Sequence, residues 1–182
     1  MRLWLTPAQA DSIAQYALDA RPQEACGLIA GIGERASQII PITNAANEPN
    51  HHFRLDDRQF TTAMFEIERA GLSLIGLYHS HPATDPIPSQ TDIHQAAYPD
   101  TAYLIVGLRS GEARLAAWEI RAAEVNPADL YVGTDMPIPQ TPALSRAEKT
   151  AIILAALIAF VFMLVLSLSL LPPAPIIMTP LP

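Results

Sequence analysis

Residues 72–78 form a short apolar run that leads directly into a pair of histidines, and this stretch constrains the fold most strongly. The run is typical of a buried strand that ends in a polar loop. Residues two apart on a strand point to the same side, so His79 and His81 present both imidazoles to one point. Asp92 follows beyond a proline-containing loop and offers a carboxylate oxygen. Two histidines and one carboxylate are typical of a catalytic zinc site, which leaves a fourth position for water.

The composition of the chain limits the kinds of metal site and binding partner that it can have. A structural zinc site needs four protein ligands, usually including several cysteines, whereas this chain has only Cys26. A single cysteine also excludes an internal disulfide and fits a reducing compartment. We interpret Cys26 as a small buried side chain on a core strand, with a metal-adjacent or redox-sensitive thiol as the alternative. The net charge of −7 argues against a nucleic-acid partner, which requires a basic surface.

The remaining pattern predicts one α/β domain at residues 1–124, with a mixed central sheet flanked by helices. Thr6 and Pro7 are typical of a helix start, and Asp56 begins a second helix that we expect to end at Ala70. Ser89 begins a short third helix. We expect strands over residues 25–32, 37–42, 51–55, 72–78, 103–108 and 113–121, the last two joined as a hairpin.

The C-terminal third differs in composition. Residues 125–149 are rich in proline and predict an extended linker, with an edge strand at 130–132 as an open alternative. Residues 150–171 are almost entirely apolar and uncharged, which predicts a transmembrane helix, followed by a short tail at 172–182. Arg146 and Lys149 flank its N-terminal side, and residues 1–5 end too early for a signal peptide. We therefore expect a single-pass C-terminal anchor, with the catalytic domain in the cytoplasm.

Four elements of the chain resemble the signature of the JAMM (MPN-plus) zinc metalloproteases, in the same order and with similar spacing. These elements are Glu24, the run His79-Ser80-His81-Pro82, Ser89 and Asp92. Residues 24–31 also look like the glutamate strand of the family. The resemblance covers roughly residues 1–121 and is to compact prokaryotic members. It implies an MPN-like, cytidine-deaminase-like sandwich and a Zn²⁺ cofactor held by His79, His81 and Asp92.

The same resemblance implies that Glu24 is the general acid/base that activates the zinc-bound water and that Ser89 stabilises the tetrahedral oxyanion. From the residues alone, Glu24 is equally well a surface residue at a strand edge. Ser89 and Asp92 likewise form a capping-box pattern, which places a carboxylate at a helix start without any metal. Of the other histidines, we interpret His51 and His52 as a rim feature without a metal role and His94 as facing solvent, and Ser80 is expected on the opposite face of the strand from its neighbours.

The implied activity is hydrolysis of the amide bond after the C-terminal tail of a ubiquitin-like or sulfur-carrier protein. An extended tail can lie beside a sheet edge with few side-chain contacts. Two alternatives stay open at this point: a non-catalytic MPN-type module that binds partners at the membrane, and a zinc amidase that acts on a small molecule. The sequence contains no His-Glu-x-x-His or Gly-x-Ser-x-Gly motif for other hydrolase classes. It leaves the oligomeric state open.

Overall fold

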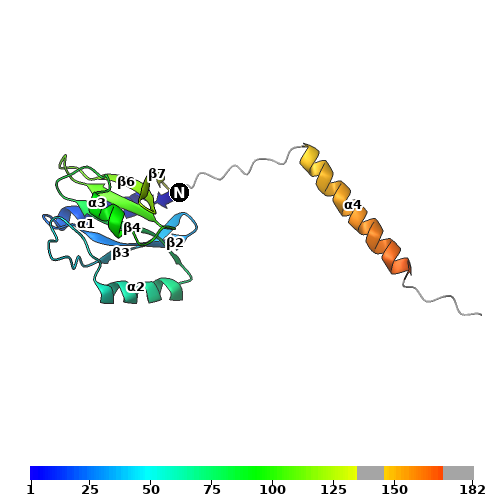
Figure 1. Ribbon diagram of the computed structural model, residues 1–182, viewed down its shortest axis with the longest axis horizontal. Coiled ribbons are helices and arrows are strands. Elements are labelled where there is room, and N and C mark those ends of the chain that lie inside the picture. The colour runs from blue at the N-terminus through cyan, green and yellow to red at the C-terminus, as the bar shows by residue number, and fades with distance from the viewer. Residues whose placement is uncertain (135–145, 170–182) are drawn as a thin grey trace, which may run out of the picture. The chain divides into compact units, whose positions relative to one another are not determined.

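The computed structural model describes residues 1–134 and 146–169 (Figure 1). The chain divides into two compact units, Met1–Met136 and Pro137–Pro182. The first unit contains three helices and seven strands, and the second contains the helix α4. In chain order the elements are β1 (Arg2–Leu5), α1 (Pro7–Asp19), β2 (Cys26–Ile32), β3 (Arg35–Ile42), α2 (Asp57–Arg69), β4 (Ser73–His81), α3 (Gln90–Gln95), β5 (Ala102–Gly107), β6 (Arg114–Arg121), β7 (Glu124–Val132) and α4 (Arg146–Ser169).

The seven strands form one mixed sheet in the order β1-β3-β2-β4-β5-β6-β7, which closes because β1 also pairs with β7. The contact between β1 and β3 is a single bridge between Trp4 and Arg35. β4 lies in the middle of the sheet, antiparallel to β2 and parallel to β5. The strand that carries the histidine pair therefore has hydrogen-bonded neighbours on both sides, which fixes its backbone.

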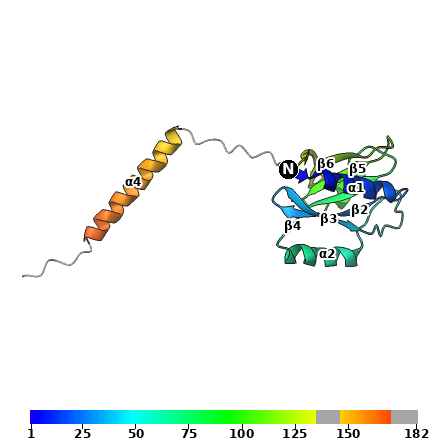
Figure 2. The same cartoon turned by 180° about the vertical axis from the view of Figure 1, so that it is seen from behind.

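Side chains alternate between two hydrophobic cores on the two faces of the sheet. On β2, Ile29 joins the core that includes Ile13 of α1, whereas Leu28 joins the core that includes Ile67 of α2. This alternation is the period of a strand buried on both faces. Figure 2 shows α1 in front of the strands, while α2 lies below them. The predicted α/β sandwich with a mixed central sheet and outer helices is confirmed.

Two predicted features of the first unit are wrong in detail. The domain does not end at residue 124, because residues 124–132 form β7, which pairs first with β6 and then with β1. Pro127 is tolerated there because β1 pairs with β7 only from Asp129 onward, so no second neighbour requires its missing N–H. Residues 51–55 form a loop with one isolated bridge, between Asn44 and Leu55, instead of a strand.

The second unit contains α4, which includes most of the predicted transmembrane segment. Among the residues that the structure describes, no helix is both long enough and apolar enough to cross a bilayer. The predicted transmembrane helix at 150–171 is therefore not supported. Residues 135–145 of the predicted linker, residues 170–171 and the tail at 172–182 lie outside the described residues.

Candidate metal centre

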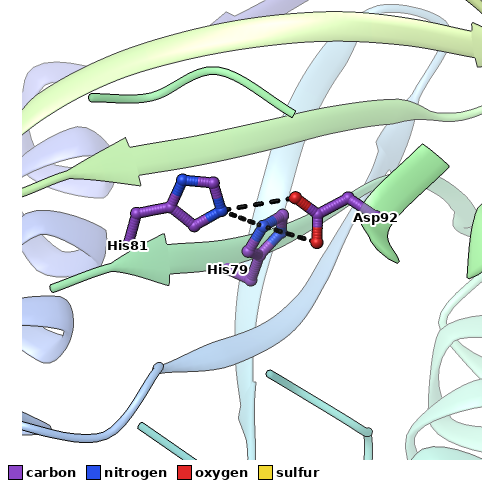
Figure 3. Close-up of side chains that lie close together, drawn as sticks. All are labelled: His79, His81 and Asp92. Carbon is purple, nitrogen blue, oxygen red and sulfur yellow. Dashed lines mark hydrogen bonds and ion pairs between the residues drawn. The ribbon is translucent and has the colours of Figure 1, made fainter. Parts of the chain in front are cut away.

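Three buried side chains converge between the end of β4 and the start of α3 (Figure 3). His79 and His81 point to the same side of β4, and their Nε2 atoms are 3.0 Å apart. Oδ1 of Asp92 lies 3.4 Å from Nε2 of His79, and Oδ2 lies 3.3 Å from Nε2 of His81. One ligand atom from each residue lies within 4.8 Å of the others, so a single metal ion can contact all three.

Asp92 is held in place by the capping box of α3. Ser89 is the N-cap residue, and its Oγ accepts a hydrogen bond of 3.2 Å from the backbone N–H of Asp92. In return, Oδ2 of Asp92 accepts a hydrogen bond of 2.7 Å from the backbone N–H of Ser89. The predicted capping box is therefore present, and it occurs together with the convergence of Asp92 on the two imidazoles. The cap fixes the carboxylate on its short helix and directs it toward the imidazoles.

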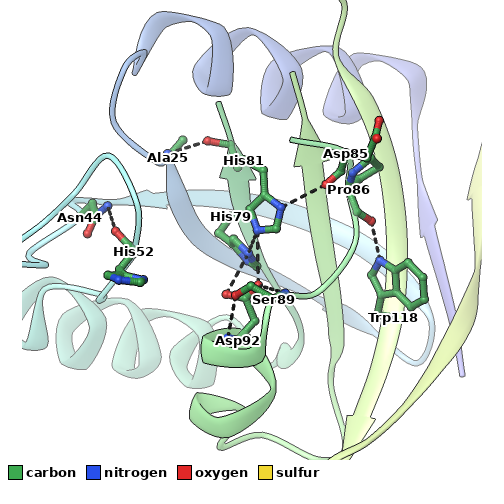
Figure 4. Close-up of polar contacts among 11 residues, drawn as sticks. Ala25, Asn44, His52, His79, His81, Asp85, Pro86, Ser89, Asp92 and Trp118 are labelled. Atoms are coloured by element: carbon green, nitrogen blue, oxygen red, sulfur yellow. Dashed lines mark hydrogen bonds and ion pairs between the residues drawn. The ribbon is translucent and has the colours of Figure 1, made fainter. Parts of the chain in front are cut away.

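His79 is oriented by an aromatic side chain from the loop between β3 and α2. The ring of Phe53 stacks on the imidazole with centroids 4.3 Å apart and planes 18° apart. Asn44 holds this loop in place: its Nδ2 donates to the carbonyl of His52 at 2.9 Å (Figure 4) and to the carbonyl of Glu24 at 3.0 Å. The amide thus links the loop that carries Phe53 to the start of β2.

His81 is oriented by a backbone carbonyl. Its Nδ1 lies 3.2 Å from the carbonyl oxygen of Asp85, in the loop that follows β4. Because a carbonyl oxygen only accepts, Nδ1 carries the proton and donates it. In the neutral imidazole the lone pair is then on Nε2, whereas in the metal-free site the protonated imidazole donates from Nε2 to Asp92. The geometry selects the tautomer that a metal ligand needs.

The electrostatics of the cluster keep the carboxylate ionised. Burial lowers the pKa of His79, which favours its neutral form. Burial acts in the same direction on His81, but its hydrogen bonds to Asp92 and to the Asp85 carbonyl raise its pKa overall. Burial also disfavours the Asp92 anion, yet the hydrogen bonds from both imidazoles and from the Ser89 N–H hold its pKa well below the usual range. The site therefore offers one anionic oxygen and two imidazoles to a cation.

Glu24 is the predicted general acid/base, and only 7% of it is exposed to solvent. It lies just before β2, where its backbone N–H donates to the carbonyl of Pro49 at 2.7 Å. Burial raises the pKa of Glu24 to about 7; the positive charge of His81 lowers it and the negative charge of Asp92 raises it further. These interactions place the carboxyl group within the electrostatic field of the cluster. A surface position at a strand edge, the alternative from sequence, is excluded by its burial.

The other predicted polar residues lie outside the cluster. The hydroxyl of Ser80 accepts a hydrogen bond of 2.8 Å from the backbone N–H of Ala25, which ties β4 to the residue before β2. Cys26 is fully buried on β2, and its thiol donates to the carbonyl of Ile42 at 3.4 Å. His94 is exposed on α3, as predicted. His51 and His52 are also exposed and do not belong to the group of potential metal ligands among the described residues.

Zn²⁺ fits the donors present. Two imidazole nitrogens and one carboxylate oxygen are a common set for catalytic zinc, and they leave a fourth coordination position for water or substrate. Each donor also has the outer contact that orients a zinc ligand: Phe53 against His79, the Asp85 carbonyl at His81 and Ser89 at Asp92. The residues in the site therefore support zinc as the cofactor.

A comparison with models of protein families shows the family to which this chain belongs. The family model described as prokaryotic homologs of the JAB domain matches residues 6–121, a range that contains all of the predicted site residues. The chain belongs to this family. The predicted relationship to the compact prokaryotic JAMM zinc metallopeptidases is thereby confirmed, and so is the JAB/MPN-like α/β fold.

Three curated relatives of this JAB-domain protein carry functional names. A desampylase from Haloferax volcanii is 36% identical over 124 residues, which cover 65% of this chain and 87% of the relative. A CysO-cysteine peptidase from Mycobacterium tuberculosis is 36% identical over 101 residues, covering 54% and 68%. A probable TtuB-protein conjugate cleaving protease from Thermus thermophilus is 37% identical over 86 residues, covering 47% and 57%.

Solved structures support the fold of this JAB-domain unit. A protein from Desulfitobacterium hafniense superposes with a TM-score of 0.66 at 29% sequence identity, covering 74% of this chain and 95% of that protein. A protein from Salinibacter ruber superposes with a TM-score of 0.57, also at 29% identity, covering 80% and 97%. Both comparisons extend over nearly the whole of the solved chains.

Sequence reasoning missed the residues that orient the imidazoles. Phe53 follows two histidines in a stretch that resembles a strand, and nothing in the local pattern indicates that its ring faces β4. Asp85 contributes through its backbone, which the identity of a side chain does not reveal. Asn44 carried the only local signal, because asparagine is favoured where its side chain bonds the backbone of a loop.

Proposed function

We propose that this protein is a zinc-dependent peptidase or isopeptidase that hydrolyses the amide bond after the C-terminal tail of a ubiquitin-like or sulfur-carrier protein. The observation that supports the chemistry most directly is the convergence of His79, His81 and Asp92 beside a buried carboxyl group whose pKa is about 7. The substrate class is proposed from the relatives, whose names describe CysO-cysteine and TtuB-protein conjugates as targets.

Zinc, when bound, acts as a Lewis acid that polarises the attacked carbonyl and lowers the pKa of water. Glu24 then has the property that a proton shuttle requires. Burial raises its pKa to about 7 in the metal-free protein, which makes the carboxylate a stronger base that can accept a proton from water and return it to the leaving amine. Its low exposure shields this transfer from bulk solvent.

Ser89 has a free donor for the developing oxyanion. A hydroxyl group has one O–H to donate and two lone pairs to accept. The capping bond from the N–H of Asp92 uses a lone pair of Ser89 Oγ and leaves its O–H available. We therefore assign Ser89 two roles: it positions a zinc ligand through the cap, and it donates a hydrogen bond to the substrate oxyanion.

A cavity beside the metal centre provides room for an extended tail. It has a volume of about 570 Å³ and lies between the 46–54 loop and α3. Phe53 and Thr91 line it; the first stacks on His79 and the second precedes Asp92. A slender tail without bulky side chains can follow this cavity to the zinc ligands, which agrees with the proposed substrate class.

Zinc binding and tail cleavage are tested on the purified full chain. The first measurement is zinc content, for which we expect one ion per chain that is lost in His81→Ala and retained in the control His94→Ala. The second follows, by mass spectrometry, a ubiquitin-like protein ending in Gly-Gly that is fused to a reporter or to a single amino acid. We expect a cut directly after the tail that depends on Glu24 and His81.

The outcomes separate the alternatives. Absence of stoichiometric, His81-dependent zinc would refute the catalytic proposal and favour a partner-binding module. Zinc with turnover of small amides, but without a cut after the tail, would refute the substrate class and favour a small-molecule amidase. The cytoplasmic placement of the catalytic unit stays a prediction, and protease protection of the expressed full chain in spheroplasts tests it.

A further inference from the structure

The loop between β4 and α3, residues 82–88, orients one of the zinc ligands through its backbone. The carbonyl of Asp85 in this loop accepts the Nδ1–H of His81 at 3.2 Å. A carbonyl does this only while the loop keeps its position relative to the strand. The orientation of the imidazole therefore depends on whatever holds residues 82–88 in place.

One contact that holds the loop comes from β6. The indole Nε1–H of Trp118 donates to the carbonyl of Pro86 at 2.9 Å, one residue beyond Asp85 (Figure 4). Because Trp118 is partly buried, water competes only weakly with the indole N–H for the Pro86 carbonyl. It joins the loop to a strand that carries none of the predicted site residues.

A second contact is the close approach of the loop to β5. Gly107 has no side chain, and a Cβ there would lie 2.5 Å from the nitrogen of Pro86 and 2.8 Å from the carbonyl carbon of Asp85. Real Cβ atoms do not approach backbone this closely, so only glycine allows the loop to rest on the strand here. The backbone of Asp85 and Pro86 is thus fixed from β5 as well as from β6.

The ion pairs of Asp85 contribute less than these two contacts. Its carboxylate lies 3.1 Å from Arg109 and 3.7 Å from Arg114, but both arginine side chains are more than two-thirds exposed. Exposed pairs of this kind contribute roughly 0–1 kcal/mol. The partly buried indole hydrogen bond and the tight glycine contact therefore dominate the position of the loop.

We propose that Trp118 is a positioning residue for the zinc ligand His81 and acts through residues 85 and 86 of the loop. The inference rests on the proposed zinc site and adds to it a residue on another strand. When the indole N–H is removed, the Pro86 carbonyl loses its hydrogen-bond donor. The Asp85 carbonyl next to it is then no longer held at a fixed distance from Nδ1 of His81. The imidazole then samples orientations, and tautomers, that do not present Nε2 to the metal.

The chain offers a matched control, because its second tryptophan makes the same kind of bond elsewhere. Nε1–H of Trp4 donates to the carbonyl of Gly133 at 3.0 Å, and Trp4 lies on β1, outside the site. Trp118→Phe and Trp4→Phe therefore remove the same donor and the same ring volume. The full chain is used for both, and zinc affinity is measured by competition with a chromophoric chelator.

We expect Trp118→Phe to weaken zinc binding about tenfold and Trp4→Phe to leave it within about twofold of the wild type. Cobalt-substituted Trp118→Phe is expected to show altered visible absorption bands, which report ligand geometry and not merely fold. Equal zinc affinity in the two variants, with unchanged cobalt bands, would overturn the inference while leaving the zinc site intact. A wild-type chain that binds no zinc would instead refute the proposed function.

A measurement on the wild type keeps the inference testable if Trp118→Phe does not fold. Nitrogen–proton correlation NMR of the imidazoles in the zinc-loaded full chain identifies which nitrogen carries the proton. We expect His81 to be protonated at Nδ1 and to bind through Nε2. Protonation at Nε2 would overturn the inference, because the Asp85 carbonyl would then have no imidazole proton to accept.

Discussion

The buried carboxyl group of Glu24 predicts a specific conflict between stability and activity. Its pKa is raised from 4.5 to about 7, chiefly by burial. In the folded protein the protonated form is therefore favoured, and its contribution to stability is fully present below pH 4.5. This contribution is lost as the pH rises through about 7, because the folded state must then hold a buried anion.

The magnitude follows from the two pKa values. The difference between 4.5 and about 7, at about 1.4 kcal/mol for each pH unit, corresponds to about 3 kcal/mol. The surrounding protein relaxes around the buried anion, so we expect a net cost of about 2 kcal/mol at pH values above about 7. Glu24→Gln removes the charge and keeps the shape. It should stabilise the metal-free protein by about this amount and raise its melting temperature by about 6 °C near pH 8.

The assay is thermal unfolding of the full chain in the presence of a chelator, because bound zinc would favour the charged form of Glu24. The stabilisation should disappear near pH 4.5, where both side chains are neutral. Glu112→Gln, at an exposed position, serves as control and should leave the melting temperature unchanged both near pH 8 and near pH 4.5. With zinc restored, Glu24→Gln should lower the rate of tail cleavage by about 10² to 10⁴-fold. A variant that melts at the same temperature as the wild type near pH 8, or gains equally at both pH values, would refute the reasoning.

Three further outcomes are expected. Ser89→Ala removes the acceptor for the N–H of Asp92 and should lower the free energy of unfolding in urea by about 1 kcal/mol. With zinc saturated, turnover should fall by about 10² to 10³-fold, and unchanged turnover would contradict the role of Ser89 at the oxyanion. Phe53→Leu removes the ring stacked on an imidazole and should weaken zinc binding several-fold in chelator competition, whereas Phe65→Leu, at an exposed position on α2, should not. Cys26, fully buried and with its pKa raised to about 12 by burial, should resist thiol reagents near pH 8 until the chain unfolds; rapid labelling of the folded protein would contradict this.

The parts of the site that the sequence predicts are those in which local geometry sets the side chain. The two-residue period of a strand brings His79 and His81 together, and the three-residue spacing of a capping box fixes Ser89 against Asp92. Neither inference requires knowledge of another segment. The burial of Glu24 is different, because it depends on the loop whose Pro49 carbonyl accepts the Glu24 N–H, and the isolated sequence left it undecided.

Some predictions failed because pairing with a segment far away in the sequence outweighs the local preference that composition indicates. The proline content of residues 125–149 indicates a linker, but for the first part of this range β1 supplies a complementary edge more than a hundred residues earlier in the chain. The orientation of both imidazoles also depends on distant segments: Phe53 in the 46–54 loop, and Trp118 on β6 through the carbonyl of Pro86. Contacts of this kind leave no periodic signal in one sequence.

The three ligands are therefore oriented by three independent devices: a ring stack at His79, a backbone carbonyl at His81 and a helix cap at Asp92. Because their anchors lie on different segments, the ligand geometry exists only once the sheet has assembled, and zinc binding is thermodynamically linked to folding of the whole unit. In the absence of a metal, the polar contacts among His79, His81 and Asp92 give these buried side chains partners. The unit can therefore fold before it is loaded, and zinc enters a site whose ligands already face one another, which lowers the cost of ordering them on binding.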